Sequence, residues 1–294
     1  MQKLLVLALA GFFAQLIDGS LGMAYGVTSS SLLLAYGLAP AVVSATVHLS
    51  EIATTAASGI SHWKLGNVDK KTLVRLTIPG AIGAFTGACF LSHLNGEIVK
   101  PYISMFLFCL GFYVLFRFLF QFNPAKSGQS RPLTKKQSVP LGFIAGFLDS
   151  TGGGGWGPVT TPVLLSKKDM APRKAVGTVD TSEFVIAVSA SCGFLISLGW
   201  KGINLLWAGV LISGGVIAAP IAAWLVRKIP ARLMGIIVGG FIILINLRTI
   251  LNGLFPNSGY HLYVYAIFIL GWMSAIVYGL RMMKLERKNE SLSV

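Results

Sequence analysis

The chain has 294 residues, of which 54% are hydrophobic and 12% are charged, and its mean hydropathy is +0.73. A soluble core cannot bury this much apolar surface but a lipid bilayer accepts it, so the composition excludes a soluble globular protein and predicts an all-α, polytopic membrane protein. The net charge of +14 would suggest nucleic-acid binding in a soluble protein. Here the basic residues lie in short loops and at the C-terminus, as the positive-inside rule describes, so we expect the lipid bilayer and no nucleic acid as partner.

Apolar segments follow one another along the whole chain. They are expected at about 2–17, 26–37, 40–62, 72–92, 101–121, 138–148, 155–166, 172–196, 203–226, 232–252 and 260–281. Some of the connecting loops are rich in Lys and Arg and others are poor in them. Placing the basic loops in the cytoplasm gives a consistent multi-pass path through the cell membrane with a cytoplasmic C-terminus.

Two of these stretches are interrupted in the same way, at residues 11–26 and 142–157. The matched positions are Gly11 with Gly142, Asp18 with Asp149, Gly22 with Gly153, Tyr25 with Trp156, and Gly26 with Gly157. Paired interrupted segments indicate the binding site of a transporter, so we expect each to be a broken hairpin that reaches the middle of the membrane. The second is predicted to enter from the cytoplasm on two arms of about 11 residues each, with Gly152–Gly155 at the tip, and the first, 2–37, to enter from outside.

The similarity between the halves continues beyond the interruptions. Ala39-Pro40 matches Ala171-Pro172, Thr46 matches Thr178, and Ser50-Glu51 matches Ser182-Glu183. Each half then holds one broken hairpin and three spans, and because three is odd the halves have opposite orientations, as in an inverted-repeat transporter. This predicts a first transmembrane repeat at 1–121, a cytoplasmic linker at 122–137, a second repeat at 138–252, and an extra transmembrane helix with a cytoplasmic tail at 253–294.

Five acidic residues lie inside apolar segments: Asp18, Glu51, Asp149, Asp180 and Glu183. A charge at membrane depth is costly, so such residues usually face a cavity or a partner. Asp18 and Asp149 are interpreted either as caps at the breaks or as a proton site, a cation site or a gate. Glu51 and Glu183 lie too deep in their helices to be caps, which leaves coupling or silent packing.

The sequence also offers partners for these acids. His48 occupies the position equivalent to Asp180, and such a titratable pair would suit proton coupling. Ser50 and Ser182 are candidate hydrogen-bond partners of the glutamates that follow them. The candidate coupling or gating residues, with protons as the coupling ion, are Asp18, Glu51, Asp149, Glu183, His48 and Asp180.

The restart of each broken helix predicts an anion site. Free N–H groups and the positive end of the helix dipole favour an anion without any Arg or Lys, and glycine lets the backbone approach a ligand closely. The alternative is that the glycines only allow tight helix contacts in the membrane. The candidate substrate-binding residues are Gly22, Tyr25, Gly26, Thr28, Ser29, Gly153, Gly154, Trp156, Gly157, Thr160 and Thr161.

Motifs of enzymes are missing from the sequence. The glycine run is not followed by Gly-Lys-Ser/Thr, there is no Gly-x-Ser-x-Gly, and the four histidines have no metal-binding spacing. We therefore expect no catalytic residue, no resident metal and no cofactor.

The doubled pattern of Gly-Phe-x-Ala-x-x-x-Asp with a glycine-rich tip, then Ala-Pro, Thr and Ser-Glu, resembles the sulfite exporter TauE/SafE family of membrane permeases. The glycines of 152–157 followed by Lys174-Ala175-Val176-Gly177-Thr178 are especially similar. The resemblance covers nearly the whole chain and implies a carrier, usually an exporter, of sulfur-containing anions such as sulfite or organosulfonates. The first tip carries larger residues than the second, so we expect the second to contact the substrate more.

Three other functions stay open from the sequence. The intramembrane carboxylates could carry a cation instead of an anion, two intramembrane aspartates are also found in membrane proteases, and the chain could be a membrane scaffold that transports nothing. Neither the oligomeric state nor the direction of transport follows from the residues.

Overall fold

The computed structural model describes residues 2–21, 23–120, 133–165, 170, 172–225, 231–255 and 259–292. Within these ranges the chain forms eleven α-helices and a short 3-10 helix and no strand, which confirms the all-α prediction. The helices of the first half are α1 (Gln2–Leu21), α2 (Tyr25–Ala35), α3 (Pro40–Lys64), α4 (Lys70–Ser92) and α5 (Gly96–Phe120). The second half comprises α6 (Lys135–Gly152), α7 (Trp156–Leu165), α8 (Pro172–Leu198), η1 (Trp200–Gly202), α9 (Leu205–Leu225) and α10 (Ala231–Leu254), and α11 (His261–Leu292) follows.

Several helices are long and apolar enough to cross a membrane. By length and composition, five such segments occur in the described part of the chain: Lys70–Ser92, Gly96–Phe120, Lys174–Leu198, Gly235–Leu254 and His261–Leu285. Leu4–Asp18 and Leu205–Ala218 are shorter apolar stretches. α3 is equally long but is rich in polar residues that it buries, among them His48 and Glu51. The chain is thus a multi-pass membrane protein, and the side of its C-terminus stays a prediction.

The predicted segments are confirmed with one systematic difference. The first arm of the second hairpin was expected to end near residue 148, but α6 has 18 residues and continues to Gly152. Hydropathy stops at Asp149, whereas the helix continues to Gly152, where the left-handed Gly153 ends it and the N–H of Gly154 donates to the carbonyl of Asp149 at 3.0 Å. α1 likewise runs past Asp18 to Leu21, so the two arms of each hairpin are unequal.

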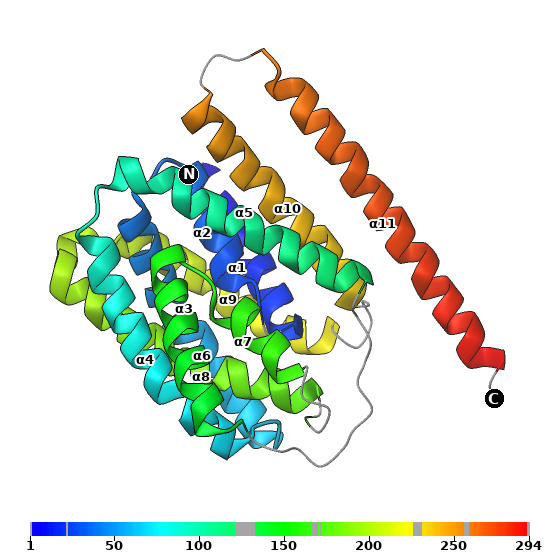
Figure 1. Cartoon of the computed structure of the whole chain (residues 1–294), viewed down its shortest axis with the longest axis horizontal. Coiled ribbons are helices and arrows are strands. Elements are labelled where there is room, and N and C mark those ends of the chain that lie inside the picture. Colours follow the sequence, from blue (N-terminus) through cyan, green and yellow to red (C-terminus); the bar gives the residue numbers. More distant parts are fainter. Residues whose placement is uncertain are drawn as a thin grey trace.

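The helices of the two halves interleave (Figure 1). α4 packs on α6, and their counterparts in the sequence repeat, α9 and α1, also pack on each other. α3 packs on its counterpart α8, and α5 on its counterpart α10. These contacts follow the pairing of the repeats, while the opposite orientation of the halves and the domain boundaries stay predictions.

Glycines allow the closest of these helix contacts. A Cβ atom added to Gly146 would overlap the carbonyl oxygen of Gly80, and one added to Gly214 would overlap that of Ala8. Small residues at helix crossings let backbones approach in membrane proteins. These glycines, which lie outside the two tips, thus serve close packing of α4 on α6 and of α1 on α9.

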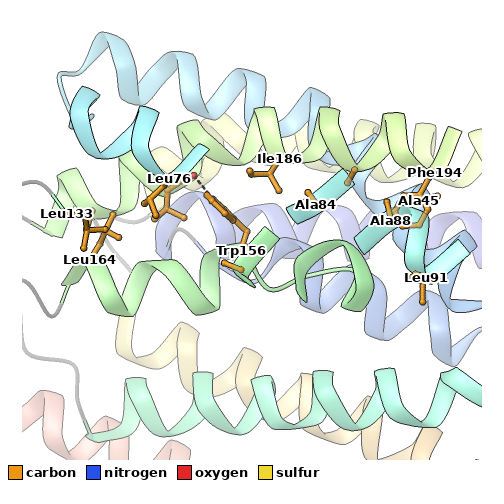
Figure 2. Close-up of a cluster of buried hydrophobic side chains, with 14 of the residues drawn as sticks. Ala45, Leu76, Ala84, Ala88, Leu91, Leu133, Trp156, Leu164, Ile186 and Phe194 are labelled. Atoms are coloured by element: carbon orange, nitrogen blue, oxygen red, sulfur yellow. Dashed lines mark hydrogen bonds between the residues drawn. The ribbon is translucent and has the colours of Figure 1, made fainter. Parts of the chain in front are cut away.

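Trp156, the first residue of α7, anchors the second tip in a hydrophobic cluster. Its side chain is fully buried, and Figure 2 shows it among Leu76, Ala84 and Ile186. Tyr25, the matching residue of α2, lies in a second cluster that includes Leu211. The two tips are thus fixed by one large aromatic residue each.

α11 lies at the periphery of the molecule. It packs chiefly against α10 and runs along its outer edge (Figure 1, orange to red). Trp272 holds it there, donating its indole N–H to the carbonyl of Ile236 at 3.0 Å. Most of its large side chains, such as Leu262 and Ile267, are exposed.

Candidate functional site

Both interrupted segments are broken helices. α6 ends at Gly152 and α7 starts at Trp156, and between them Gly153 and Gly154 have φ angles of 69° and 154°. These left-handed values suit glycine, which has no Cβ to clash. In the first tip Ala24 takes φ of 117°, the one positive φ of a non-glycine residue in the described ranges.

The sequence predicted the two aspartates at the breaks themselves. In the structure each lies in the last turn of the helix that precedes the break. From there Asp149 Oδ1 accepts the N–H groups of Gly155 at 2.7 Å and Trp156 at 2.9 Å. Asp18 Oδ1 accepts the N–H of Tyr25 at 3.4 Å. The carboxylates therefore cap the restarting helices and use N–H groups that a bound anion would need.

The two tips make matching contacts with the long helices behind them. The Tyr25 hydroxyl donates to Ser50 Oγ at 3.1 Å, and the Trp156 indole N–H donates to Ser182 Oγ at 2.9 Å. Each serine in turn donates to a carbonyl one turn earlier in its helix, at 2.7 Å and 2.6 Å. Residues that match in the sequence repeat thus form equivalent side-chain hydrogen bonds in the two halves.

Ser50 and Ser182 therefore do not form hydrogen bonds with Glu51 and Glu183, the glutamates that follow them in the sequence. Both carboxylate oxygens of Glu51 and the Oε2 of Glu183 are buried without a hydrogen-bond partner in the described part of the chain. The sequence offered these serines or backbone carbonyls as partners of the glutamates; in the structure the aromatic residues of the tips donate to both serine hydroxyls.

The two tips touch each other. A Cβ atom on Gly26 would lie 2.9 Å from the Cα of Gly154, so these backbones are in direct contact. The Ser30 hydroxyl donates to the carbonyl of Gly153, and the Ser44 hydroxyl donates to that of Ser150 at 2.6 Å. Two serine hydroxyls of the first half thus bind backbone carbonyls of the second tip.

His48 joins α3 of the first half to the tip of the second. Its Nδ1 lies 2.8 Å from the carbonyl oxygen of Ser44, which fixes a proton on that nitrogen. Its Nε2 lies 3.0 Å from Asp149 Oδ2 and 3.9 Å from Glu51 Oε2. The short contact needs one proton, which either the ring or the carboxyl group can carry.

A second cluster lies beside the first tip. One carboxylate oxygen from each of Asp18, Asp180 and Glu183 lies within 4.8 Å of the others, an arrangement that could hold a metal ion. His62 Nε2 is 3.8 Å from Asp180 Oδ2. Sequence spacing did not indicate this cluster because α1 and α8 are far apart along the chain. All six predicted coupling residues are therefore buried around the two tips.

The predicted substrate residues are buried as well, apart from Gly22, which lies outside the described residues. The hydroxyls of Thr28 and Ser29 have no hydrogen-bond partner among the residues that the structure describes. Thr28 also lines an apolar cavity of about 350 Å³ between α1, α2, α10 and α11. Thr160 donates to the carbonyl of Trp156 at 2.5 Å, and Thr161 is buried behind it.

Two contributors, Ser44 and Asn246, were not predicted from the sequence, whereas Ser30 belongs to the hydroxyl-rich start that follows the first break in the sequence. Ser30 and Ser44 bind the second tip, and Asn246 of α10 donates to Ser31 Oγ at 2.7 Å. The spacing of four between Ser44 and His48 places both on one helix face and could have indicated the former. No sequence signal indicates Asn246.

A polar cavity of about 310 Å³ lies at the far end of α2, between α5 and α10. Its lining includes Ala35 at the end of α2 together with Glu97, Lys100 and Arg248. Two cations against one carboxylate give this cavity a net positive lining, which attracts anions.

Comparison with known proteins gives a consistent result. The sequence model of a family described as "Sulfite exporter TauE/SafE" matches residues 7–249. "Probable membrane transporter protein YtnM" of Bacillus subtilis (strain 168) is 63% identical over 278 residues, which cover 95% of this chain and 93% of that protein. "Probable membrane transporter protein YunE" of the same organism is 23% identical over 271 residues, which cover 85% of this chain and 98% of that protein. No solved structure matches the chain.

Proposed function

Because the chain belongs to the TauE/SafE family of membrane transporters, we propose that it is a secondary transporter that exports small sulfur-containing anions such as sulfite or organosulfonates. The resemblance noted in the sequence is thereby confirmed at the level of the family. The anion is our proposal, which the geometry of the two tips supports.

The observation that carries the proposal is the contact between the two broken helices. Gly26 and Gly154 meet backbone to backbone, and helix starts from both halves lie at this one place. Helix N-termini favour anions, and glycines let an oxyanion approach the backbone. The unpartnered hydroxyl of Ser29 lies in the first turns of α2 and adds a donor.

Asp149 suggests how binding and coupling are linked. Its carboxylate holds the N–H groups of Gly155 and Trp156, so a substrate oxyanion and this side chain compete for the same donors. If the pair of Asp149 and His48 takes up a further proton from solution, so that Asp149 becomes neutral, the carboxyl group holds the donors less strongly and they become available to the anion. Substrate and proton would then bind together.

Export also has a driving force that needs no coupling ion. An inside-negative potential favours the exit of an anion by about 2.3 kcal/mol per charge per 100 mV. The cationic side chains of Lys100 and Arg248 line a cavity at the other end of α2 and would attract an anion there.

The proposal is tested by flux through proteoliposomes that contain the purified chain. Sulfite, sulfoacetate, sulfate and chloride are supplied in turn, with and without a pH gradient, and protein-free liposomes serve as the control. We expect sulfite or a sulfonate to move faster than chloride, and a pH gradient to change the rate. The proposal fails if no sulfur oxyanion or sulfonate crosses while the protein is folded.

A second candidate keeps the transporter and changes the cargo to a cation. It is favoured by the close approach of the carboxylates of Asp18, Asp180 and Glu183. In the described part of the chain no Lys or Arg forms an ion pair with them. The same liposomes loaded with Mn²⁺ or Na⁺ decide between the two. Cation flux in the absence of any anion flux would replace the first proposal by the second.

A further inference from the structure

The buried acids and His48 form two triads that correspond between the halves. The imidazole triad consists of Asp149, His48 and Glu51, and the carboxylate triad consists of Asp18, Asp180 and Glu183. In each triad the aspartate comes from one tip, and the other two residues, three positions apart, come from the long helix of the other half, α3 or α8. The triads therefore differ at one position, where His48 corresponds to Asp180.

The imidazole triad contains its own positive or donor group. His48 Nε2 lies 3.0 Å from one carboxylate and 3.9 Å from the other. A single nitrogen thus lies between the two acids, and a proton on it offsets their charge.

The carboxylate triad contains no such group. Its oxygens lie within 4.8 Å of one another, and the exposed fractions are 2% for Asp18, 1% for Asp180 and 6% for Glu183. Ionised carboxylates only accept hydrogen bonds, so the three cannot satisfy one another. Buried like charges at this separation repel strongly unless protons neutralise them or a cation lies between them.

The protein around this triad leaves oxygens without partners. Both oxygens of Asp180 and the Oε2 of Glu183 have no hydrogen-bond partner in the described ranges, although each side chain is more than nine-tenths buried. Ser58 lies close to Asp180, but no hydrogen bond of normal geometry joins them. The nearest nitrogen, His62 Nε2, is 3.8 Å from Asp180.

We propose that the carboxylate triad of Asp18, Asp180 and Glu183 binds a hard cation, Na⁺ or a divalent ion of the Ca²⁺ or Mn²⁺ type, at the position that His48 occupies in the other triad. Such ions take oxygen ligands at about 2.1–2.6 Å, so two ligands of one ion lie up to about 5 Å apart, which fits the observed cluster. The ion would satisfy the oxygens that have no protein partner.

The role of the ion in transport rests on the proposed function. A cation held beside the first tip, together with a proton held beside the second, would place positive charge on both sides of an anion bound between them. Binding of the ion does not depend on this role and is measured without any anion, so the two proposals fail separately.

The test is cation binding to the purified full chain in detergent. The chain is kept in choline buffer of constant ionic strength, and NaCl, CaCl₂ or MnCl₂ is added while thermal unfolding and equilibrium dialysis of the ion are followed. We expect one of these ions to bind in a saturable way and to raise the unfolding temperature. The absence of binding by all three ions would overturn the proposal.

Two variants locate the site. Asp180→Asn and Glu183→Gln remove a charged ligand each and are expected to raise the apparent Kd by at least about tenfold. Asp69→Asn, which changes an aspartate that caps α4 and belongs to neither triad, is the matched control and should bind the ion as the native chain does. Equal affinity in all of these chains would contradict the proposal.

A third variant, designed to gain an ion site, tests the proposal if the Asp180 and Glu183 variants do not fold. His48→Asp makes the imidazole triad match the carboxylate triad, so the variant is expected to bind about twice as many ions per chain as the native protein. An unchanged number of bound ions in a folded His48→Asp chain would overturn the proposal.

Discussion

Asp149 is the residue on which the contacts of the second tip converge. One of its oxygens caps α7 through two N–H groups, and the other meets His48. Asp18 makes a single and longer contact of this kind, with Tyr25. Capping and coupling, which stood as alternatives in the sequence, are therefore compatible uses of the two oxygens of one side chain.

Changing Asp149→Asn should separate these two uses. The amide oxygen still caps α7, so the free energy of unfolding falls by no more than about 1 kcal/mol. The amide group cannot take up a proton, so the effect of a pH gradient on anion flux is expected to disappear. Flux in proteoliposomes with and without the gradient measures this.

The control for that experiment is Asp69→Asn, which also exchanges a capping carboxylate, here one that accepts the N–H of Thr72 at 2.7 Å. It should keep the response to the pH gradient. If the Asp149→Asn chain responded in the same way as this control, proton transfer at Asp149 would be refuted.

Ala24 offers a prediction about stability. Its φ of 117° is unfavourable for any residue with a Cβ. Ala24→Gly should remove this strain and raise the free energy of unfolding by up to about 1 kcal/mol, whereas Ala10→Gly inside α1 should lower it by about 0.5–1 kcal/mol. Thermal unfolding in one detergent compares the two, and a loss of stability in both would show that Ala24 is not strained.

At the level of the helices, the repeat in the sequence was the strongest source of information. The matched aspartates and glycines predicted both breaks and their equivalent places in the two halves. They did so because polar residues and glycines that interrupt an apolar helix can be recognised from hydropathy, and their constant spacing shows that the two segments correspond. The ends of α1 and α6 were placed too early because hydropathy stops at the acid, whereas α6 ends only where Gly153 adopts a left-handed conformation.

The triads show what the sequence could not give. Each buried acid was found because it interrupts an apolar run, but its partners come from another helix of the other half. The sequence predicted that His48 and Asp180 correspond to each other, but it did not indicate their partners: in the structure each lies beside the tip aspartate of the opposite half. That pairing depends on how α3 and α8 pack, which no local pattern encodes.

Helix packing gives a prediction on α9, where Gly214 lies against α1 and Gly209 lies on the exposed side. A Cβ at Gly214 would overlap the Ala8 carbonyl and lie 2.9 Å from the N of Phe12, whereas Gly209 has nothing within 4 Å. Gly214→Leu is therefore expected to destabilise the chain by about 2 kcal/mol or more, and Gly209→Leu to be tolerated.

The yield and the unfolding temperature of the detergent-purified variants measure this difference. Equal losses for the two substitutions would show that α1 and α9 do not meet at Gly214.

At the level of the whole molecule, α11 lies apart from the two triads, although its Trp272 lines the apolar cavity beside Thr28. It packs chiefly on α10, and the family match of residues 7–249 ends before it begins. The extra helix predicted after the second repeat is thus present, and neither triad includes a residue from it.

A chain that ends at Phe255 should therefore still carry out flux. The loss of Trp272 exposes Gly240 and neighbouring residues of α10 to lipid, which costs little in a bilayer. A chain that ends at Leu225 is the matched control, because it also lacks α10 and the Asn246 contact with Ser31, and should be inactive. Loss of flux in the longer of the two chains would show that α11 belongs to the transport unit.

The interleaving of the two halves has a consequence for biogenesis. α1 emerges from the ribosome roughly 200 residues before its main packing partner α9, a delay of about 10–40 s at 5–20 residues per second. During that time the acids of α1 and α3 lack the second half that surrounds them in the native state. The nascent first half must therefore be sheltered by the insertion machinery or stay partly out of the lipid, and correct assembly is completed only after α9 has been made.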